Sequence, residues 1–259
     1  MRILLVGDVI AQPGLAAIER FLPQLRRERA LDLVVANGEN VAAGLGLTIA
    51  DAQALFAAGV DVITSGNHIW DRREIVEFME QGQPVLRPLN YPEGAPGSGY
   101  AISKDVLVVS LLGRINIDSV DCPFARIADL LDELPDRPAV SVVDFHALDP
   151  MEKVAMGWYL DGRVSAVVGT HTHIPTADVR LLPAGTAFVG DIGMVGPYNS
   201  VAGVEIEPAI ARFRTRLPPG FLGFRAASGP VMFNSVLVDV DEESGQAVDI
   251  TRVDEMVEL

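Results

Sequence analysis

The chain has little of what several common kinds of protein site and segment require. Its 259 residues include a single cysteine, Cys122, which excludes an internal disulfide and a structural zinc centre built on cysteines. The longest apolar run, residues 106–112, has the length of one strand, whereas a helix needs ~20 apolar residues to span a bilayer. The N-terminus leads straight into a strand pattern, with no charged and apolar leader before it. We therefore expect a cytoplasmic protein without a membrane segment.

Basic residues are also few. Lys and Arg together number 20 against 35 for Asp and Glu, and the formal net charge is -15. This balance disfavours stable binding to long nucleic acid, which requires clustered Lys and Arg. It does not exclude phosphate substrates, because two bound divalent cations would add about +4 to the charge of a pocket. The composition therefore favours a small phosphoester over a polymer as substrate.

Apolar segments of strand and helix length make up much of the chain. Hydrophobic residues account for 49% of the sequence, which is enough to fill a sizeable core. In the first half strands alternate with helices, which predicts βαβ units and a largely parallel sheet. Thr48 and Asp51 resemble a capping box at the start of one helix. We expect strands at 2–6, 33–36 and 60–64, and helices at about 14–29, from 48 onward and at 71–81.

The second half of the sequence predicts more strands around two further helices. Residues 83–99 are rich in Pro, Gly and Asn, and we expect an irregular loop insertion there. One domain over 1–259, built from two sheets, is the simplest interpretation. We expect strands at 100–103, 106–112, 139–143, 164–168, 178–182, 187–190, 231–240 and 247–253, and helices at about 123–134 and 151–160.

All the histidines of the chain fall in short polar motifs that follow apolar, strand-like runs. Asp8 and the pair Glu39-Asn40 follow two such runs as well. In open α/β sheets the carboxyl ends of the strands converge on one place, where binding sites form. We therefore expect these side chains to lie close together. The histidines are His68, in Gly66-Asn67-His68, His146, and the pair in Gly169-Thr170-His171-Thr172-His173.

These donor types suit a two-metal phosphoester hydrolase. A pair of metal ions needs a bridging carboxylate, and Glu39 is the natural one. Oxygen and imidazole donors without thiolate suit Fe, Mn or Zn. His68 would then protonate the leaving oxygen, with Asp71 placed to orient it. We expect Asp8, Asn40 and His173 at one ion and Asn67, His146 and His171 at the other, with His171 and His173 on one face of a strand-like segment.

Each of these residues has a plainer interpretation when it is taken alone. Asp8 is a common helix-entry residue, Glu39-Asn40 is typical of a turn, and His146 could be a hydrogen-bonded core histidine. The joint pattern favours a metal site, because unrelated structural residues would not all follow strands in this order. A one-metal amidohydrolase that uses His171 and His173 is a further alternative, but its His-x-His would lie on an early barrel strand.

Candidates for substrate contact are weaker. Asn90, together with Arg87, lies in the irregular loop and could touch a substrate, although a structural role in the loop is the stronger alternative. Gly193 and Met194 belong to a Gly-punctuated segment that could line the pocket or form a turn.

Taken in order, the motifs around these residues resemble the calcineurin-like metallophosphoesterase superfamily. More narrowly, the chain is similar to the YmdB-like family of 2',3'-cyclic-nucleotide phosphodiesterases. The resemblance spans nearly the whole chain and rests on long runs, which are more specific than a Gly-Asn-His match. The runs are 36–40, 66–68, 87–92, 157–173 and 191–194, with Gly7-Asp8 before them and His146 between them.

The resemblance implies a four-layer α/β/β/α sandwich, with two mixed sheets flanked by helices. It also implies two transition metal ions, Fe or Mn before Zn, and activity on 2',3'-cyclic nucleotides. Asp8 is followed by Val9-Ile10, where the wider superfamily has Asp-x-His, and Glu39 replaces the usual bridging Asp. Both departures match the narrower family. The resemblance carries a ligand role to Asp8, Glu39, Asn40, Asn67, His146, His171 and His173, and an acid role to His68.

Two functions therefore stay open from the sequence. The first is a phosphodiesterase that acts on small cyclic nucleotides, in which a hydroxide shared by the metals attacks phosphorus. The second is a regulatory protein that binds a nucleotide as a signal and hydrolyses it only incidentally. Departures from the family at 11–15, 147–150 and Val195 leave the substrate preference undecided. A homo-oligomer is also expected, from the abundance of apolar segments.

Overall fold

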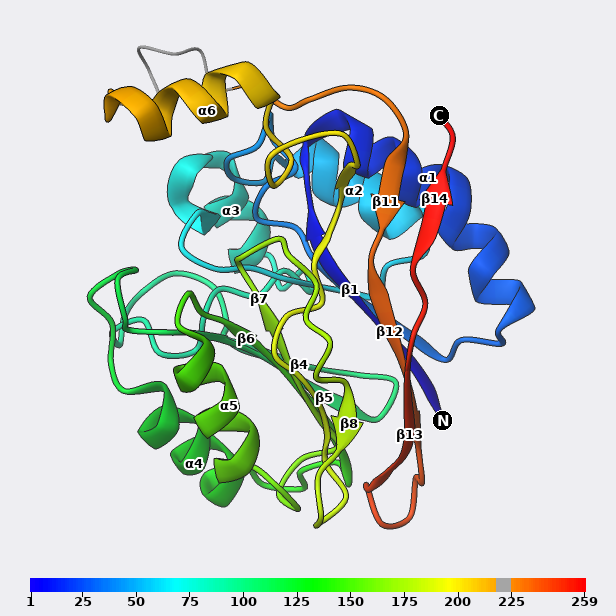
Figure 1. Cartoon of the computed structure of the whole chain (residues 1–259). Coiled ribbons are helices and arrows are strands. Elements are labelled where there is room, and N and C mark those ends of the chain that lie inside the picture. The colour runs from blue at the N-terminus through cyan, green and yellow to red at the C-terminus, as the bar shows by residue number, and fades with distance from the viewer. Residues whose placement is uncertain (218–224) are drawn as a thin grey trace.

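The fold is a stack of four layers. The computed structural model describes residues 1–217 and 225–259. Two mixed sheets lie face to face, and helices cover the outer face of each sheet (Figure 1). One apolar cluster fills the space between the sheets, and two others lie under the helices on either side. The predicted α/β/β/α sandwich is thus confirmed.

The first sheet is arranged around β1 (Arg2–Val9), which is buried at every position after its first residue. Here β1 runs parallel to β2 (Leu33–Asn37) and β10 (Met194–Pro197), and antiparallel to β12 (Ser235–Val240). A strand with neighbours on both edges and layers on both faces needs a continuous apolar run, as β1 has. The other strands of this sheet are β3 (Val62–Thr64), β11 (Val231–Phe233), β13 (Ala247–Arg252) and β14 (Glu255–Val257).

The second sheet is mainly parallel. Its described strands follow the order β4-β5-β6-β7-β9-β8, and only the two edge strands run antiparallel to their neighbours. The central strands are wholly buried because the first sheet covers one face and helices cover the other. The strands are β4 (Tyr100–Ser103), β5 (Val106–Leu112), β6 (Val140–His146), β7 (Ala166–Thr170), β8 (Arg180–Leu181) and β9 (Ala187–Val189).

Helices from the two halves of the chain cover opposite faces of the stack (Figure 1). α1 (Ala11–Glu28), α2 (Ile49–Ala57) and α3 (Glu74–Glu80) pack on the first sheet. α4 (Pro123–Glu133) and α5 (Pro150–Tyr159) pack on the second. No helix in the described residues is long and apolar enough to cross a membrane.

Most predicted elements are present, with shifted ends. The capping box at Thr48 and Asp51 is confirmed, with both of its reciprocal hydrogen bonds. The helix expected from residue 71 begins instead at Glu74, after a 3-10 turn at Ile69–Asp71. The expected strand 231–240 divides at Asn234 into β11 and β12. Three short elements were not expected: β10, β14 and α6 (Ile206–Thr215).

The loop insertion expected at 83–99 is irregular in the structure. It forms only isolated bridges, from Val85 to Ile63 and from Leu86 to Ser98. The organisation of 1–259 as a single domain stays a prediction.

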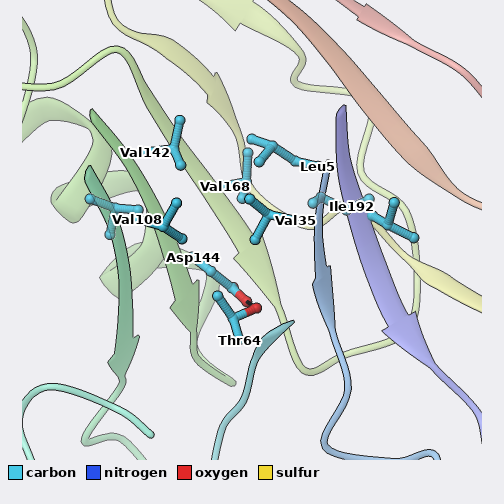
Figure 2. A pocket seen from close by; sticks show the side chains of 10 residues that line it. Leu5, Val35, Thr64, Val108, Val142, Asp144, Val168 and Ile192 are labelled. Carbon is cyan, nitrogen blue, oxygen red and sulfur yellow. Dashed lines mark hydrogen bonds between the residues drawn. The ribbon is translucent and has the colours of Figure 1, made fainter. Parts of the chain in front are cut away.

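The core between the sheets contains one polar pair. Figure 2 shows the Asp144 carboxyl of β6 and the Thr64 hydroxyl of β3 directed toward each other among aliphatic side chains, including those of Val35, Val108 and Val142. The Thr64 hydroxyl donates to Asp144 at 2.5 Å. A buried carboxylate in such surroundings must be hydrogen-bonded, so this pair ties the first sheet to the second directly below the carboxyl ends of their strands.

Candidate metal centre

The seven predicted metal ligands lie at or after the carboxyl ends of strands from both sheets. Strands of the first sheet place Asp8, Glu39, Asn40 and Asn67, and strands of the second sheet place the three histidines. The sheets face each other, so the two groups meet across one gap. Asp8 lies near the end of β1, Glu39 and Asn40 follow β2, Asn67 follows β3, His146 ends β6, and His171 and His173 follow β7.

Glu39, His146 and His171 form the tightest group. Glu39 Oε1 lies 2.9 Å from His146 Nε2, and His171 Nδ1 lies 2.9 Å from the same nitrogen. One donor atom from each residue falls within 4.8 Å of the others, a spacing suited to a metal ion. Glu39 and His146 are fully buried, and His171 is partly buried. A carboxylate and two imidazoles that crowd one point are typical of a cation site.

Asp8 and His173 form a second group beside the first. Asp8 Oδ1 lies 3.7 Å from His173 Nε2. His173 Nδ1 lies 3.1 Å from the carbonyl oxygen of Ala202. A carbonyl can only accept, so Nδ1 carries the proton and Nε2 presents its lone pair toward Asp8. This tautomer is the one that a metal bound at Nε2 requires.

Buried oxygen atoms without partners test whether this donor set fits metal ions. Among the described residues, Asp8 Oδ1, Asn40 Oδ1 and Asn67 Oδ1 are buried and accept no hydrogen bond. The Asn40 amide nitrogen donates to the Gly44 carbonyl at 3.0 Å, which fixes Oδ1 on the opposite side. An unsatisfied buried acceptor costs about 1–3 kcal/mol. Bound cations would satisfy all three oxygens at once, so the donor set fits the metals that the family resemblance implies.

The pKa shifts of Glu39, His146 and His171 also favour a cation at this place. Burial alone would raise the pKa of Glu39, but the charge and hydrogen bond of His146 outweigh it and lower that pKa. Burial likewise opposes the charged form of His146, yet Glu39 raises its pKa above the ordinary value. Burial and the charge of His146 lower the pKa of His171 to about 3. One proton on His146 therefore compensates the Glu39 carboxylate, as a cation at this place would do.

A chain of buried hydroxyl and carboxyl groups orients His146. Its Nδ1 lies 3.0 Å from Thr170 Oγ1, which in turn donates to Asp144 Oδ1 at 2.6 Å. Because the Thr170 hydroxyl gives its only proton to Asp144, it acts as an acceptor toward His146, and Nδ1 carries a proton. The other ring nitrogen, Nε2, then faces Glu39 or a metal. Asn37 donates to Asp144 at 3.1 Å and adds a third partner. Such outer hydrogen bonds fix the ring orientation of metal-binding histidines.

The segment of His171 and His173 is not the strand-like pair expected. Their φ angles are 98° and 63°, so both lie in the left-handed region, which non-glycine residues adopt rarely. β7 ends at Thr170, and the two rings reach the site from a tight loop. The expectation that alternation along a strand places both side chains on one face was wrong.

Asp191 holds this loop in place. Its Oδ2 accepts from the Thr172 hydroxyl at 2.7 Å and from the Thr172 backbone nitrogen at 3.2 Å. The same oxygen pairs with Lys153 Nζ at 2.6 Å, and both side chains are almost completely buried. Asp8 Oδ2 accepts from the His171 backbone nitrogen at 3.1 Å on the other side. Backbone strain of this kind persists only where the surroundings determine it.

Lys153→Met is expected to lower the free energy of unfolding by about 3–5 kcal/mol, because the Asp191 carboxylate would stay buried without its partner. Bound metal should fall as well, since the loop that carries His171 loses an anchor. Urea unfolding followed by circular dichroism, together with metal analysis, measures both effects. Lys104→Met is the matched control, because the Lys104–Asp61 pair is exposed at the lysine and should contribute about 1 kcal/mol or less. Equal losses in the two variants would contradict the anchoring role.

His68 lies at the rim of the group. Its backbone nitrogen donates to Glu39 Oε2 at 3.0 Å, and its Nδ1 lies 2.8 Å from Asp71 Oδ2, as the spacing of the two residues predicts. The carboxylate accepts from Nδ1, so the ring presents Nε2 outward. The side chain is 31% exposed. It is therefore an imidazole of this site that a substrate can reach.

The three predicted substrate contacts are all buried. Asn90 is fully buried, and its amide bonds the backbone of Leu112 and Asp121, so the structure gives it a structural role. Gly193 accepts the Asp8 backbone N–H at 3.2 Å with its carbonyl, and Met194 pairs with Asp8 across the two strands. These two buried residues hold the backbone of Asp8.

Sequence reasoning did not assign the residues that orient the ligands. The sequence analysis gave no role to Thr170, Asp144 or Lys153. The available signal was a polar side chain in the middle of a buried run, as Asp144 is in Val140–His146. A polar group in such a place needs partners, so it marks a network even before its partners are known.

Known proteins resemble this chain over its whole length. The sequence pattern of the YmdB-like protein family matches residues 4–253. A 2',3'-cyclic-nucleotide 2'-phosphodiesterase of Bacillus subtilis (strain 168) is 42% identical over 98% of this chain and 96% of its own. A solved structure of a hypothetical protein from Thermus thermophilus has a TM-score of 0.92 at 43% identity and covers 99% of both chains. A Mycoplasma pneumoniae phosphatase structure has a TM-score of 0.91 at 29% identity, over 100% of this chain and 94% of that one.

These matches bear on the class of the protein as well as on its fold. Relatives that align from end to end are named phosphodiesterase and phosphatase, so the prediction of an enzyme, a phosphoester hydrolase, is confirmed. Among the motifs that carry the resemblance, those that hold the predicted ligands lie at the carboxyl ends of strands. The chain belongs to the YmdB-like protein family.

Proposed function

We propose that this chain is a two-metal phosphodiesterase that hydrolyses small phosphodiesters, with 2',3'-cyclic nucleotides as the preferred substrates. The observation that carries the proposal is the set of buried, partnerless oxygens of Asp8, Asn40 and Asn67 beside the Glu39–His146–His171 group. The name of the 42% identical relative supports the substrate class.

Glu39 would bridge the two ions, because its two oxygens face different neighbours. Oε1 faces His146 Nε2, and Oε2 lies on the side of His68. When bound, the two ions supply Lewis-acid stabilisation of the phosphoryl oxygens and a water molecule activated at neutral pH. Donors without thiolate favour iron or manganese, with zinc as the third choice. Asp8, Asn40 and His173 would hold one ion, and Asn67, His146 and His171 the other.

His68 would donate a proton to the leaving oxygen of the diester. Asp71 fixes the ring through Nδ1, so the proton would pass from Nε2. The backbone N–H of His68 is bonded to Glu39, and this bond sets the distance between the ring and the bridging carboxylate. The acid is therefore positioned by the same residue that would hold both metals.

His68→Gln is expected to lower kcat on 2',3'-cyclic AMP by about 100-fold, at the lower end of what general acids contribute. The loss should be several-fold smaller on bis-p-nitrophenyl phosphate, whose leaving group needs no proton. Metal content should stay at the wild-type level, because His68 is not among the proposed ligands. Steady-state kinetics on both substrates checks this. Equal losses on the two substrates would contradict proton donation.

Turnover by purified protein tests the proposal itself. The protein, loaded in turn with iron, manganese and zinc, is assayed against a panel of 2',3'- and 3',5'-cyclic nucleotides and a generic aryl phosphodiester. We expect multiple turnovers, fastest on 2',3'-cyclic nucleotides. Tight nucleotide binding without product would overturn the proposal in favour of the regulatory alternative.

A further inference from the structure

A cleft beside the proposed metal centre has no role in the chemistry described so far. Its described walls come from the loop that follows β2, from the loop that follows β10, and from Ile10, the residue directly after β1. Asn40, His68 and His173 form the side that faces the metals. The carboxyl end of β1 and the two loops lie near α6 in Figure 1. A molecule that binds phosphate at the metals can therefore extend into this cleft.

The lining of the cleft is aliphatic or backbone. Apart from the three metal-side residues, the described residues that line it carry no charged side chain. Ile10 and Val204 are buried, whereas Leu45 is 41% exposed at the mouth. A wall of this kind disfavours a phosphate or carboxylate and favours a neutral apolar surface. The walls include Ile10, Leu45, Ala202, Gly203, Val204 and Ala226.

The size of the cleft allows a flat ring to enter in part, with the remainder at the open mouth. Its volume is about 110 Å³, compared with ~150 Å³ for an engineered apolar cavity that binds benzene. The cleft is too small for a whole nucleotide, and it opens directly onto the metal side. Only the part of a substrate that lies farthest from phosphorus would enter it.

One wall is tied to a proposed metal ligand. The Ala202 carbonyl accepts from His173 Nδ1 at 3.1 Å. Gly203 has φ +94°, and a Cβ there would meet Ile10 Cγ2 at 2.9 Å, so the wall keeps its shape only with glycine at this position. The spacing between the metals and the cleft is thus fixed by covalent and hydrogen-bonded geometry.

We propose that this cleft binds the nucleobase of the substrate and gives the enzyme its preference for nucleotides over other phosphodiesters. The inference rests on the proposed function and deepens it. The flat faces of a base would pack between Leu45 and the 202–204 loop, while the cyclic phosphate reaches the metals past His68 and His173.

The test compares two substrates with the same reacting group. One is 2',3'-cyclic AMP, and the other is methyl riboside 2',3'-cyclic phosphate, which lacks the base. For the wild type we expect kcat/KM at least tenfold higher for the nucleotide. Leu45→Ala should lower the ratio of the two kcat/KM values about fivefold, as expected for the loss of one apolar contact. Ala226→Phe, which fills the cleft, should lower the ratio further.

Leu181→Ala is the matched control, because Leu181 is 42% exposed and lies on β8 at the edge of the second sheet. It should leave the ratio unchanged. A wild type that cleaves both substrates equally well, or a ratio that Leu45→Ala and Ala226→Phe do not change, would overturn the nucleobase site and leave the phosphodiesterase intact. A wild type that cleaves neither substrate would overturn the proposed function as well.

Discussion

Glu39→Gln is expected to lower kcat on 2',3'-cyclic AMP by on the order of 10³-fold, the loss typical of removing a main electrostatic element of a site. Gln keeps the size and shape of the side chain but removes the negative charge that both ions would share. The fully buried His146 would also lose the carboxylate that holds its proton, which lies 2.9 Å from Nε2. Bound metal should therefore fall together with turnover, while circular dichroism shows the same fold.

Glu74→Gln is the matched control for this change. Glu74 lies at the start of α3 and accepts from the Ile49 backbone nitrogen, away from the metal ligands. Its substitution should leave kcat and metal content at wild-type levels. Full activity of Glu39→Gln with two metals bound would remove the bridging carboxylate from the mechanism.

Gly66→Ala is expected to abolish metal binding through steric overlap alone. A Cβ at residue 66 would overlap the ring of His146, at carbons Cγ and Cδ2 and at Nε2. His146 is fully buried and is held from behind by Thr170, so the ring cannot move away without leaving its hydrogen bond. Overpacking of this kind costs about 1–3 kcal/mol in unfolding free energy. Activity should fall to the level of Glu39→Gln, because the ring carries the nitrogen that faces Glu39.

A double mutant separates the clash from other effects of the added methyl group. With His146→Ala in the background, the space that Gly66→Ala needs is open, and its further cost in stability should be close to zero. Urea unfolding of the wild type, the two single mutants and the double mutant gives the coupling. If Gly66→Ala costs as much without the His146 ring as with it, the packing of glycine against this ligand is not the cause.

The sequence predicted the layers of the fold because most strands are buried on both faces. β1, β5 and β6 read as continuous apolar runs, and all three lie in the interior of the two sheets. β10 was not expected, since Met194–Pro197 contains a glycine and a proline and has little strand propensity of its own. It is a strand because β1 and β11 pair with it on either side.

α6 was missed for a related reason. Ile210 and Phe213 are exposed, at 49% and 72%, so the helix has little of the burial that a sequence pattern usually reflects. The expected homo-oligomer stays a prediction.

The side chains that gather at the site could be predicted, but their local geometry could not. His146 was expected after a strand that ends at residue 143, yet it is the last residue of β6 and takes its orientation from Thr170 on the neighbouring strand. The left-handed backbone of His171 depends on contacts from Asp8 and on the Asp191–Thr172 bonds, which lie far apart in sequence. Side chains beyond the local sequence therefore set the geometry of the ligands.

Asn90 is a loop residue whose role depends on its hydrogen-bonding partners. Its sequence context left a substrate contact open beside the stronger alternative of a structural role, and its amide holds the backbone of Leu112 and Asp121. Polar residues in loops can serve either binding or structure, and only the position of the hydrogen-bonding partners decides between these roles.

Anomalous diffraction from crystals of the metal-loaded protein would test most directly whether Glu39 bridges two cations. We expect two peaks ~3.5–4 Å apart, each about 2.0–2.2 Å from an oxygen of Glu39. One peak should lie next to Asp8 and His173, and the other next to His146 and His171. A single peak, or peaks that Glu39 does not contact, would contradict the two-metal site.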